Sequence, residues 1–321
     1  MLSEFDLIKQ FFVRPGAGRA ELGIGDDCAL LRPTPGMTMA ISSDMLVEDR
    51  HFFAGEDPRR LGHKSLAVNL SDLAAMGARP VAFTLALALP VADADWLRAF
   101  SGGLFALADA HGCELIGGDT TKGPLNICIT IFGEVASSRA LRRDAARAGD
   151  DIWVSGTLGD ARLALAGLRG ETPLAADALA QAAQRMHLPT PRVALGLALA
   201  GQGLAHAAID ISDGLAGDLG HILERSGAGA TLDADALPAG PVLATQDIAL
   251  RRAYTAAGGD DYELCFTAPA AQREAILAAG VACGTPVARV GRIEAERGLR
   301  FVDAAGAPLD LRLGGFDHFV V

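Results

Sequence analysis

The sequence predicts a two-domain protein of the α/β (α+β) class. In both halves of the 321 residues, short apolar segments typical of strands alternate with longer segments typical of helices. Residues 137–151 are the only long stretch without apolar periodicity, and they are rich in arginine, alanine and glycine. We therefore expect an N-terminal domain at 1–138 and a C-terminal domain at 149–321.

The N-terminal half contains three predicted strands and two predicted helices. Strands are indicated where β-branched or alternating apolar residues are bounded by Gly, Pro or Asp. They are expected at 37–43, 81–89 and 125–135. One helix begins after Asp57, a good N-cap that is followed by proline, and ends near Gly77. A second helix is expected at 94–110.

The C-terminal half continues this alternation. Strands are expected at 152–155, 207–211 and 262–267. Helices are expected at 161–168 and at 215–224, and the second of them ends before a Ser-Gly pair.

The charge balance is acidic, because 28 Lys and Arg residues face 39 Asp and Glu residues and the formal net charge is −11. A surface for nucleic acid or for an anionic membrane would need a basic excess. The longest uncharged apolar run, at 81–92, is shorter than the roughly 18 residues that cross a bilayer. The chain begins without a basic and apolar leader, so we expect a cytoplasmic protein with no nucleic-acid and no membrane partner.

Familiar sequence signatures of cofactor sites are absent. Five cysteines, an odd number without a CxxC pair, predict free and buried thiols rather than disulfides or a zinc site. The sequence has no GxxxxGK[ST] loop, GxGxxG fingerprint, GxSxG elbow, HExxH or EF-hand pattern. A bound nucleotide would therefore need another arrangement of residues.

Carboxylates in the N-terminal half occur near glycines and at the expected end of a strand. Asp27 lies in the glycine-flanked segment GIGDD, which by itself is more typical of a solvated turn. Ser42, Ser43 and Asp44 close the strand predicted at 37–43, where a capping turn is the alternative.

The helix after Asp57 carries a polar stripe, because Ser65, Asn69 and Asp72 recur at i, i+4 and i+7. A solvent-facing stripe would carry Lys, Glu or Arg. These short side chains are therefore expected on a packed face that looks into a polar site.

Two further segments combine a strand end with aspartates and hydroxyl groups. In LIGGDTTKG the glycines would let backbone N–H groups approach a phosphate, and Asp119 could hold a metal. Asp210, Ser212 and Asp213 end a strand that leads into a helix, where simple N-capping is the alternative and could coexist with binding.

More aspartates lie at these positions than capping requires, namely Asp27, Asp44, Asp72, Asp119 and Asp210. If they converge, their charges repel each other unless cations neutralise them. Mg²⁺ prefers such oxygen ligands and bridges phosphoryl groups in kinases and ATPases. The residues therefore predict a phosphoryl-transfer site with several Mg²⁺ ions and no Walker loop.

Seven motifs, in order along nearly the whole chain, resemble those of the thiamine-monophosphate kinases. They are GIGDDCALL, ISSDMLV with the following His51, KSLAVNLSDLAAMGARP, LIGGDTTKGPL, AIDISDGL, GGDDYELCF and the terminal GFDHF. The wider superfamily includes aminoimidazole ribonucleotide synthetase and selenophosphate synthetase and shares the acidic N-terminal motifs. It does not share the combination LSDLAAMGA, GGDTT and DYELCF.

The resemblance implies an N-terminal α/β domain that dimerises through its sheet, a C-terminal α+β domain, and ATP with several Mg²⁺ ions at the cleft between them. ATP would phosphorylate thiamine monophosphate to thiamine diphosphate by direct in-line transfer, with no residue acting as covalent nucleophile. Residues that match the family's metal ligands are Asp27, Ser42, Ser43, Asp44, Asp72, Asp119, Asp210 and Asp213. Those that match its ATP contacts are Gly118, Asp119, Arg143 and Ser212, and the thiamine phosphate pocket would contain His51, Asp260 and Phe316.

Two positions depart from the family pattern. Asp260 stands where the family usually has Glu, which is one methylene longer, and Ser43 stands where it often has Thr. Two other functions are compatible with the sequence: another ATP-dependent synthetase of the same superfamily, or a non-catalytic regulator that binds nucleotide or divalent cations.

Overall fold

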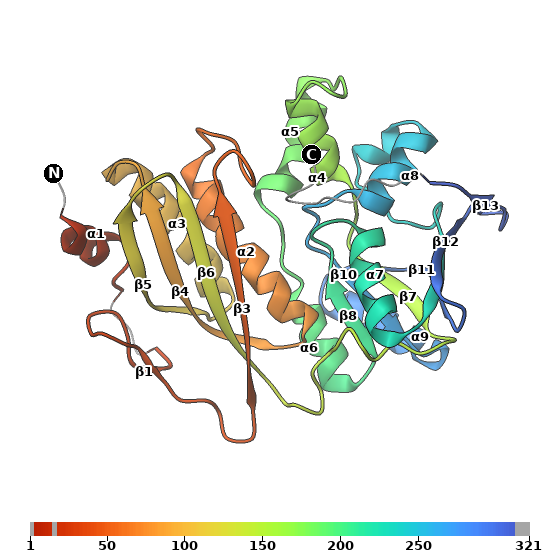
Figure 1. The fold of residues 1–321 in the computed structure, drawn as a ribbon, viewed down its shortest axis with the longest axis horizontal. Helices are drawn as coiled ribbons and strands as arrows, with labels where there is room; N and C mark the ends of the chain where they lie inside the picture. Colours follow the sequence, from red (N-terminus) through yellow and green to blue (C-terminus); the bar gives the residue numbers. More distant parts are fainter. Residues whose placement is uncertain (1–2, 15–17, 312–321) are drawn as a thin grey trace. The chain divides into compact units, whose positions relative to one another are not determined.

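The computed structural model describes residues 3–14 and 18–311, which divide into two compact units (Figure 1). The first unit comprises the chain up to Leu73 together with Ala78–Ser138. The second comprises Ala74–Gly77 and the chain from Arg139 onward. No helix in the described residues is long and apolar enough to cross a membrane.

A four-stranded sheet with the order β3-β6-β4-β5 forms the centre of the first unit. Strand β6 is antiparallel to β3 and β4, and β5 is parallel to β4. The strands are β3 (Thr38–Val47), β4 (Arg79–Leu89), β5 (Glu114–Lys122) and β6 (Asn126–Val135). The unit also contains helix α1 (Glu4–Phe11) and a separate pair of short strands, β1 (Ala20–Leu22) and β2 (Leu30–Leu31).

Helices α2 (Pro58–Ala75) and α3 (Ala94–Ala110) lie on one face of this sheet (Figure 1). Asp57 caps α2, as predicted, because its carboxylate accepts the N–H of Arg60 over 3.0 Å. The two helices approach closely at Gly62, where a Cβ atom would lie 2.0 Å from the carbonyl oxygen of Phe100. Apolar side chains of the sheet beneath the helices, such as Leu46, Leu85 and Ile129, are buried.

The opposite face of the sheet is more open. Side chains alternate between the two faces along a strand, so Ile41, Ser43 and Met45 of β3 share this open face. Ile41 is 63 % exposed and Met45 is 53 % exposed, whereas Leu46 on the helix-covered face is buried. The first unit thus leaves apolar side chains of its central sheet in contact with water.

A seven-stranded sheet with the order β13-β12-β9-β11-β7-β10-β8 forms the centre of the second unit. Neighbouring strands are antiparallel except for β9 and β12. The strands are β7 (Asp151–Ser155), β8 (Ala207–Asp210), β9 (Gly229–Asp233), β10 (Leu264–Ala268), β11 (Val287–Glu294), β12 (Gly298–Val302) and β13 (Pro308–Leu309). The α-helices are α4 (Asp160–Leu168), α5 (Ala176–His187), α6 (Val193–Gln202), α7 (Leu215–Ser226), α8 (Ile248–Ala257) and α9 (Arg273–Ala282).

Two strands extend beyond their predicted ends. Strand β3 continues to Val47, so the prediction that residues 42–44 close the strand is wrong. Strand β5 likewise contains residues 117–121, which were expected to follow a strand. In both cases a neighbouring strand supplies a continuous ladder of backbone partners, and this pairing outweighs the turn propensity of Gly, Ser and Asp.

Strand β10 begins at Leu264, two residues later than predicted. The reason lies in Asp260 and Tyr262, whose φ angles of 68° and 49° are incompatible with a strand. The sequence did not predict strands β1, β2, β9, β11, β12 and β13 or helices α1, α5, α6, α8 and α9.

The cysteines are all free, as predicted, but they are not all buried. Cys113 and Cys265 are buried, whereas Cys28 is exposed and Cys128 and Cys283 are half-buried. Burial raises the pKa of the Cys113 thiol to about 12, so this thiol stays protonated and unreactive near neutral pH.

Candidate active site

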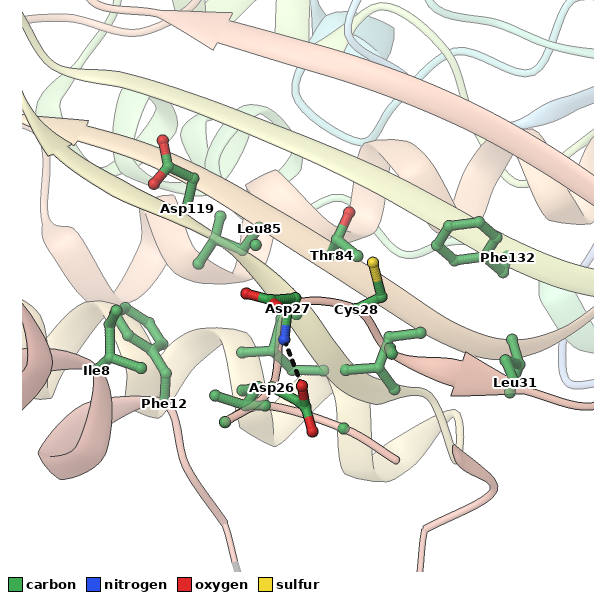
Figure 2. A pocket seen from close by; sticks show the side chains of 18 of the residues that line it. Ile8, Phe12, Asp26, Asp27, Cys28, Leu31, Thr84, Leu85, Asp119 and Phe132 are labelled. Carbon is green, nitrogen blue, oxygen red and sulfur yellow. Dashed lines mark hydrogen bonds between the residues drawn. The ribbon is translucent and has the colours of Figure 1, made fainter. Parts of the chain in front are cut away.

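An open pocket of about 1010 Å³ lies on the first unit beside strand β5 (Figure 2). The loop 23–29, residues 115–120 and helix α1 contribute to its walls. Three residues singled out in the sequence, Asp27, Gly118 and Asp119, line it together. Figure 2 shows the side chains of Asp27 and Asp119 among those that surround the pocket.

Backbone contacts around this pocket determine the turn at Asp27 and require glycine at position 118. The N–H of Asp27 donates to the carboxylate of Asp26 over 2.9 Å, which fixes the turn between the two aspartates. Gly118 has a φ of 148°, and a Cβ there would lie 1.9 Å from the carbonyl oxygen of Leu85. Only glycine fits so close to strand β4. Because Asp27 and Asp119 are both exposed, a cation or a ligand can reach them from solvent.

Ser42, Asp44 and Asp72 form a second polar group on the helix-covered face of the sheet. The Ser42 hydroxyl donates to the carboxylate of Asp72. The backbone N–H of Asp44 donates to the side-chain oxygen of Asn69 over 3.3 Å. Asn69 in turn donates to the carbonyl oxygen of Ser65 over 3.0 Å, and both of these residues are buried. The polar stripe of α2 is therefore packed against β3, which confirms the prediction that it does not face solvent.

Ser43 points away from this group because of the pleat of β3. Its hydroxyl donates to the carbonyl oxygen of Ile129 over 3.2 Å and lies 3.0 Å from the hydroxyl of Thr130. Ser43 thus belongs to the open face, whereas its two neighbours Ser42 and Asp44 belong to the helix-covered face.

The register of the sheet also separates Asp44 from Asp119. They belong to β3 and β5, the two edge strands. Asp44 is in one row with Ile129 and Leu85, whose side chains are buried beneath the helices. Asp119 pairs with the exposed Ala86 on the open face. The first unit therefore contains two separate carboxylate groups rather than a single cluster.

These groups have the donor chemistry that magnesium prefers. Carboxylate and hydroxyl oxygens suit Mg²⁺, whereas zinc sites are usually built from cysteine and histidine. In the described part of the chain, no three His, Cys, Asp or Glu side chains lie close enough together to hold a metal ion. The assignment of individual metal ligands therefore stays a prediction.

His51 is tied back to the end of strand β3. Its Nδ1 atom accepts the backbone N–H of Val47 over 3.0 Å, and the backbone N–H of His51 donates to the carbonyl oxygen of Val47 over 2.9 Å. Since Nδ1 acts as an acceptor, the proton of a neutral His51 ring is on Nε2. The imidazole thus has a fixed orientation in the turn that follows the strand.

In the second unit, strand β8 ends at the buried Asp210, and Asp218 organises the loop that follows. One carboxylate oxygen of Asp218 accepts the backbone N–H groups of Ser212, Asp213 and Gly214 over 3.0, 3.2 and 3.1 Å. Burial and then the nearby charge of Asp213 raise the pKa of Asp218 to about 7. The N-cap of α7 is Gly214, so the alternative that Ser212 or Asp213 serves as this cap is wrong.

The loop that carries Asp260 is bonded to the loop after β8. The N–H of Asp260 donates to the carbonyl oxygen of Ser212 over 2.8 Å, and the N–H of Tyr262 donates to that of Ile211 over 2.8 Å. Gly259 permits this approach, because a Cβ there would lie 2.6 Å from the carbonyl oxygen of Ser212. The second unit thus brings together Ser212, which was predicted to contact ATP, and Asp260, which was predicted to contact thiamine monophosphate.

Two predicted residues stand outside these arrangements. Arg143 is exposed in the segment between β6 and β7, and its carbonyl oxygen accepts the hydroxyl of Ser226 over 2.9 Å. Phe316 lies outside the described residues, so its predicted role is not addressed by the structure.

Sequence reasoning missed the acidic residues that shape the two loops of the second unit, Asp218, Asp261 and Glu263. Asp218 lies in the first turn of α7, where an aspartate is common near N–H groups. Glu263 directly precedes the fully buried strand β10. A charged residue next to a run of buried apolar residues was the signal that could have identified it.

Comparison with known protein families defines the class of this protein first. The family described as AIR synthase related protein, N-terminal domain, matches residues 25–135. The corresponding C-terminal domain family matches residues 147–304. Together they cover most of the chain, so the protein is a two-domain member of the AIR synthase related class.

Relatives with known names narrow this class to one family. The chain is 46 % identical to thiamine-monophosphate kinase of Salmonella typhimurium over 321 residues, which cover 98 % of each protein. It is also 46 % identical to thiamine-monophosphate kinase of Escherichia coli strain K12 over 323 residues, again with 98 % of each protein covered. The chain belongs to the thiamine-monophosphate kinase family, as its motifs predicted.

Solved structures agree with this assignment. The crystal structure of thiamine-monophosphate kinase from Stenotrophomonas maltophilia K279a matches with a TM-score of 0.84 and 47 % identity, covering 91 % of this chain and 92 % of that one. A structure of AaThiL complexed with AMPPCP and TMP matches with a TM-score of 0.77 and 29 % identity, covering 90 % of this chain and 89 % of that one. These matches confirm the predicted fold class.

Proposed function

We propose that this protein catalyses the ATP-dependent phosphorylation of thiamine monophosphate to thiamine diphosphate. The observation that carries the proposal is the 46 % identity with thiamine-monophosphate kinases over 98 % of the chain. The geometry of the second unit supports it, because Ser212 and Asp260 are joined through the backbone and a two-substrate enzyme must hold both substrates side by side.

Several residues are proposed to hold the two substrates. Gly118, Asp119, Arg143 and Ser212 would contact ATP. His51, Asp260 and Phe316 would contact thiamine monophosphate. The fixed positive charge of the thiazolium ring would be matched by the Asp260 carboxylate and by the aromatic face of Phe316.

The reaction needs little acid–base chemistry from the protein. The acceptor is a phosphate monoester, whose oxygens are largely ionised near neutral pH, so it needs no strong general base. The obstacle is instead the repulsion between two polyanions. Mg²⁺ ions would supply the positive charge that screens this repulsion, held by Asp27, Ser42, Ser43, Asp44, Asp72, Asp119, Asp210 and Asp213. The residues that bind ATP and thiamine monophosphate orient them for direct in-line transfer, and no residue becomes phosphorylated.

We also propose that the active protein is a homodimer in which a second copy of the chain covers the open face of the first sheet. Ile41 and Met45 place exposed apolar surface on this face. Apolar patches of a sheet are favourable to bury against a matching surface, and two identical sheets offer such a surface to each other. The cytoplasmic location of the enzyme stays a prediction from the sequence.

An assay of ADP release tests the proposed activity. Purified protein with ATP and Mg²⁺ should release ADP when thiamine monophosphate is present and should release none when it is omitted. Chelation of the divalent cation should stop the reaction. A non-catalytic regulator would release no ADP under any of these conditions.

A further inference from the structure

Asp260 is held in a left-handed turn that needs support from its surroundings. Asp260 and Tyr262 have φ angles of 68° and 49°, a region that residues other than glycine seldom occupy. Such a conformation persists only where neighbouring structure fixes it. Between them, Asp261 is buried, and both of its carboxylate oxygens lie 2.9 Å from the N–H of Gly159, which donates to them.

Glu263 anchors the end of this turn. Its side chain is 0 % exposed, and donors from three different elements converge on its carboxylate. The hydroxyl of Ser155, at the end of β7, donates over 2.6 Å. Arg192, directly before α6, donates through Nε over 2.6 Å and through its second nitrogen as well. Arg185 of α5 donates over 2.8 Å. The carboxylate is thus fully engaged by charged and polar partners.

The same partners connect Glu263 to the rest of the turn. Arg185 also donates to the carbonyl oxygen of Asp261 over 3.0 Å. The carbonyl oxygen of Glu263 accepts the N–H of Ile211 over 2.8 Å. Gly156 leaves no spare room, since a Cβ there would lie 2.1 Å from a carboxylate oxygen of Glu263. A displacement of the Glu263 side chain would therefore move the backbone of the turn.

The turn also orients the Asp260 carboxylate itself. The hydroxyl of Tyr262 donates to a carboxylate oxygen of Asp260 over 3.1 Å. Tyr262 makes this bond from a left-handed conformation, with a φ of 49°, and Glu263 is the next residue in the chain. The Asp260 side chain is thus bonded to Tyr262, the residue directly before the buried Glu263.

We propose that Glu263, held by Arg185 and Arg192, is a positioning residue that keeps Asp260 in place for substrate binding. The proposal rests on the proposed function, because it takes Asp260 as a contact of thiamine monophosphate. Glu263 acts through the turn and touches neither substrate. Its loss should therefore weaken the binding of thiamine monophosphate more than that of ATP.

Glu263→Gln tests this role, because the amide keeps the shape of the side chain but loses the charge that holds both arginines. Asp151→Asn is a matched control. Asp151 is also buried and is bound by two arginines, Arg273 and Arg289, in the same unit. It lies at the opposite end of β7 from Ser155. The folding of each variant is followed by thermal unfolding, and the Michaelis constants for both substrates are measured in turn.

We expect Glu263→Gln to raise KM for thiamine monophosphate at least about tenfold while KM for ATP changes less than about threefold. Asp151→Asn should leave both constants unchanged. Arg192→Lys keeps the charge but loses the two-point contact, so it should shift KM for thiamine monophosphate in the same direction by a smaller factor. It also provides the test if Glu263→Gln does not fold.

The outcomes separate this proposal from the proposed function. If folded Glu263→Gln keeps the wild-type KM for thiamine monophosphate, or raises both constants equally, the positioning role is overturned while normal turnover by the wild type upholds the function. If neither the wild type nor Asp151→Asn releases ADP with thiamine monophosphate, the proposed function fails and the positioning role falls with it.

Discussion

The backbone N–H of Asp260 donates to the carbonyl oxygen of Ser212 over 2.8 Å. This bond joins the loop proposed to bind thiamine monophosphate to the loop proposed to bind ATP. The loops can lie so close because they meet at glycines, and a Cβ at Gly214 would lie 2.7 Å from the carbonyl carbon of Ala257. Substitutions that enlarge these glycines would disturb both loops. The binding of each substrate is therefore best tested separately, by changing side chains.

Asp119→Asn should reduce kcat at least about 100-fold, because it removes a negative charge from a site that must hold cations beside phosphates. The fold should be unaffected, since the carboxylate is exposed in the pocket of the first unit. Asp109→Asn is the control, because Asp109 is an exposed aspartate that pairs with Arg14 over 2.6 Å. Steady-state rates of both variants and of the wild type are measured at saturating Mg²⁺. A fully active Asp119→Asn enzyme would show that Asp119 is not a metal ligand.

Asp44→Asn should cause a loss of kcat of similar size, although Asp44 lies on the other face of the sheet. If both Asp44→Asn and Asp119→Asn lose activity, both carboxylate groups of the first unit are needed for the reaction. A loss confined to one of the two variants would show that only one group takes part. Circular dichroism of both variants checks that the loss does not come from unfolding.

Asp210→Asn should weaken nucleotide binding in a Mg²⁺-dependent manner. Asp210 ends strand β8 next to the loop that Asp218 fixes, and the isosteric amide preserves this geometry while it removes the charge. Calorimetric titration with a non-hydrolysable ATP analogue at several Mg²⁺ concentrations measures the effect. Equal affinities of variant and wild type at every Mg²⁺ concentration would reduce Asp210 to a structural residue.

Asp260→Ala should raise KM for thiamine monophosphate much more than KM for ATP, because the lost contact is remote from the transferred phosphoryl group. Asp260→Glu should be close to neutral or improved, since it restores the length usual in the family. Initial rates with each substrate varied in turn provide both constants. Wild-type constants for Asp260→Ala would contradict the proposed substrate pocket.

Ile41→Glu should shift the protein from dimer to monomer, because it places a charge on the open face of the first sheet, where Ile41 is 63 % exposed. Light scattering coupled to size-exclusion chromatography measures the mass in solution. Val281→Glu, on a residue of the second unit that is 84 % exposed, serves as the control and should leave the mass unchanged. A wild-type protein that is monomeric at all concentrations would contradict the proposed dimer.

Glu134 should stabilise the first unit above mildly acidic pH. It is buried and bound by Arg19, Arg79 and Thr34, and the hydrogen bond from Arg19 is the main reason that its pKa falls from 4.5 to about 2. A lowered pKa contributes stability that is present above the unfolded pKa and is lost as the pH falls toward the folded pKa. Glu134→Gln should therefore lower the free energy of unfolding by roughly 3 kcal/mol near neutral pH.

Urea unfolding of wild type and Glu134→Gln checks this behaviour. The difference in the free energy of unfolding should narrow as the pH falls from about 4.5 toward about 2. A difference of the same size near pH 3 and near pH 7 would show that the charge of Glu134 is not the source of its stabilising effect.

Local signals in the sequence predicted much of the fold. The strand at 81–89 and the helix at 94–110 could be placed because their apolar patterns are long. The start of α2 could be placed because Asp57 is a recognisable cap, and it does accept the N–H of Arg60. The polar stripe of Ser65 and Asn69 was interpretable because no solvent-facing helix would carry it.

The remaining features depend on contacts between distant segments. Ser42, Ser43 and Asp44 read as a strand end, but pairing with β6 over the whole of Thr38–Val47 keeps them in the strand. That pairing also determines that Ser43 and Ser42 face opposite sides, which a list of motifs does not reveal. The ionic contacts of Glu263 join segments far apart in the chain, so no local pattern predicts them.

The fate of the γ-phosphoryl group of ATP tests the proposed function most directly. With γ-labelled ATP, Mg²⁺ and thiamine monophosphate, the label should appear in thiamine diphosphate, with one ADP formed for each molecule of product. Label that appears only as inorganic phosphate, or ADP release that does not depend on thiamine monophosphate, would contradict the kinase function and favour a synthetase of the same superfamily.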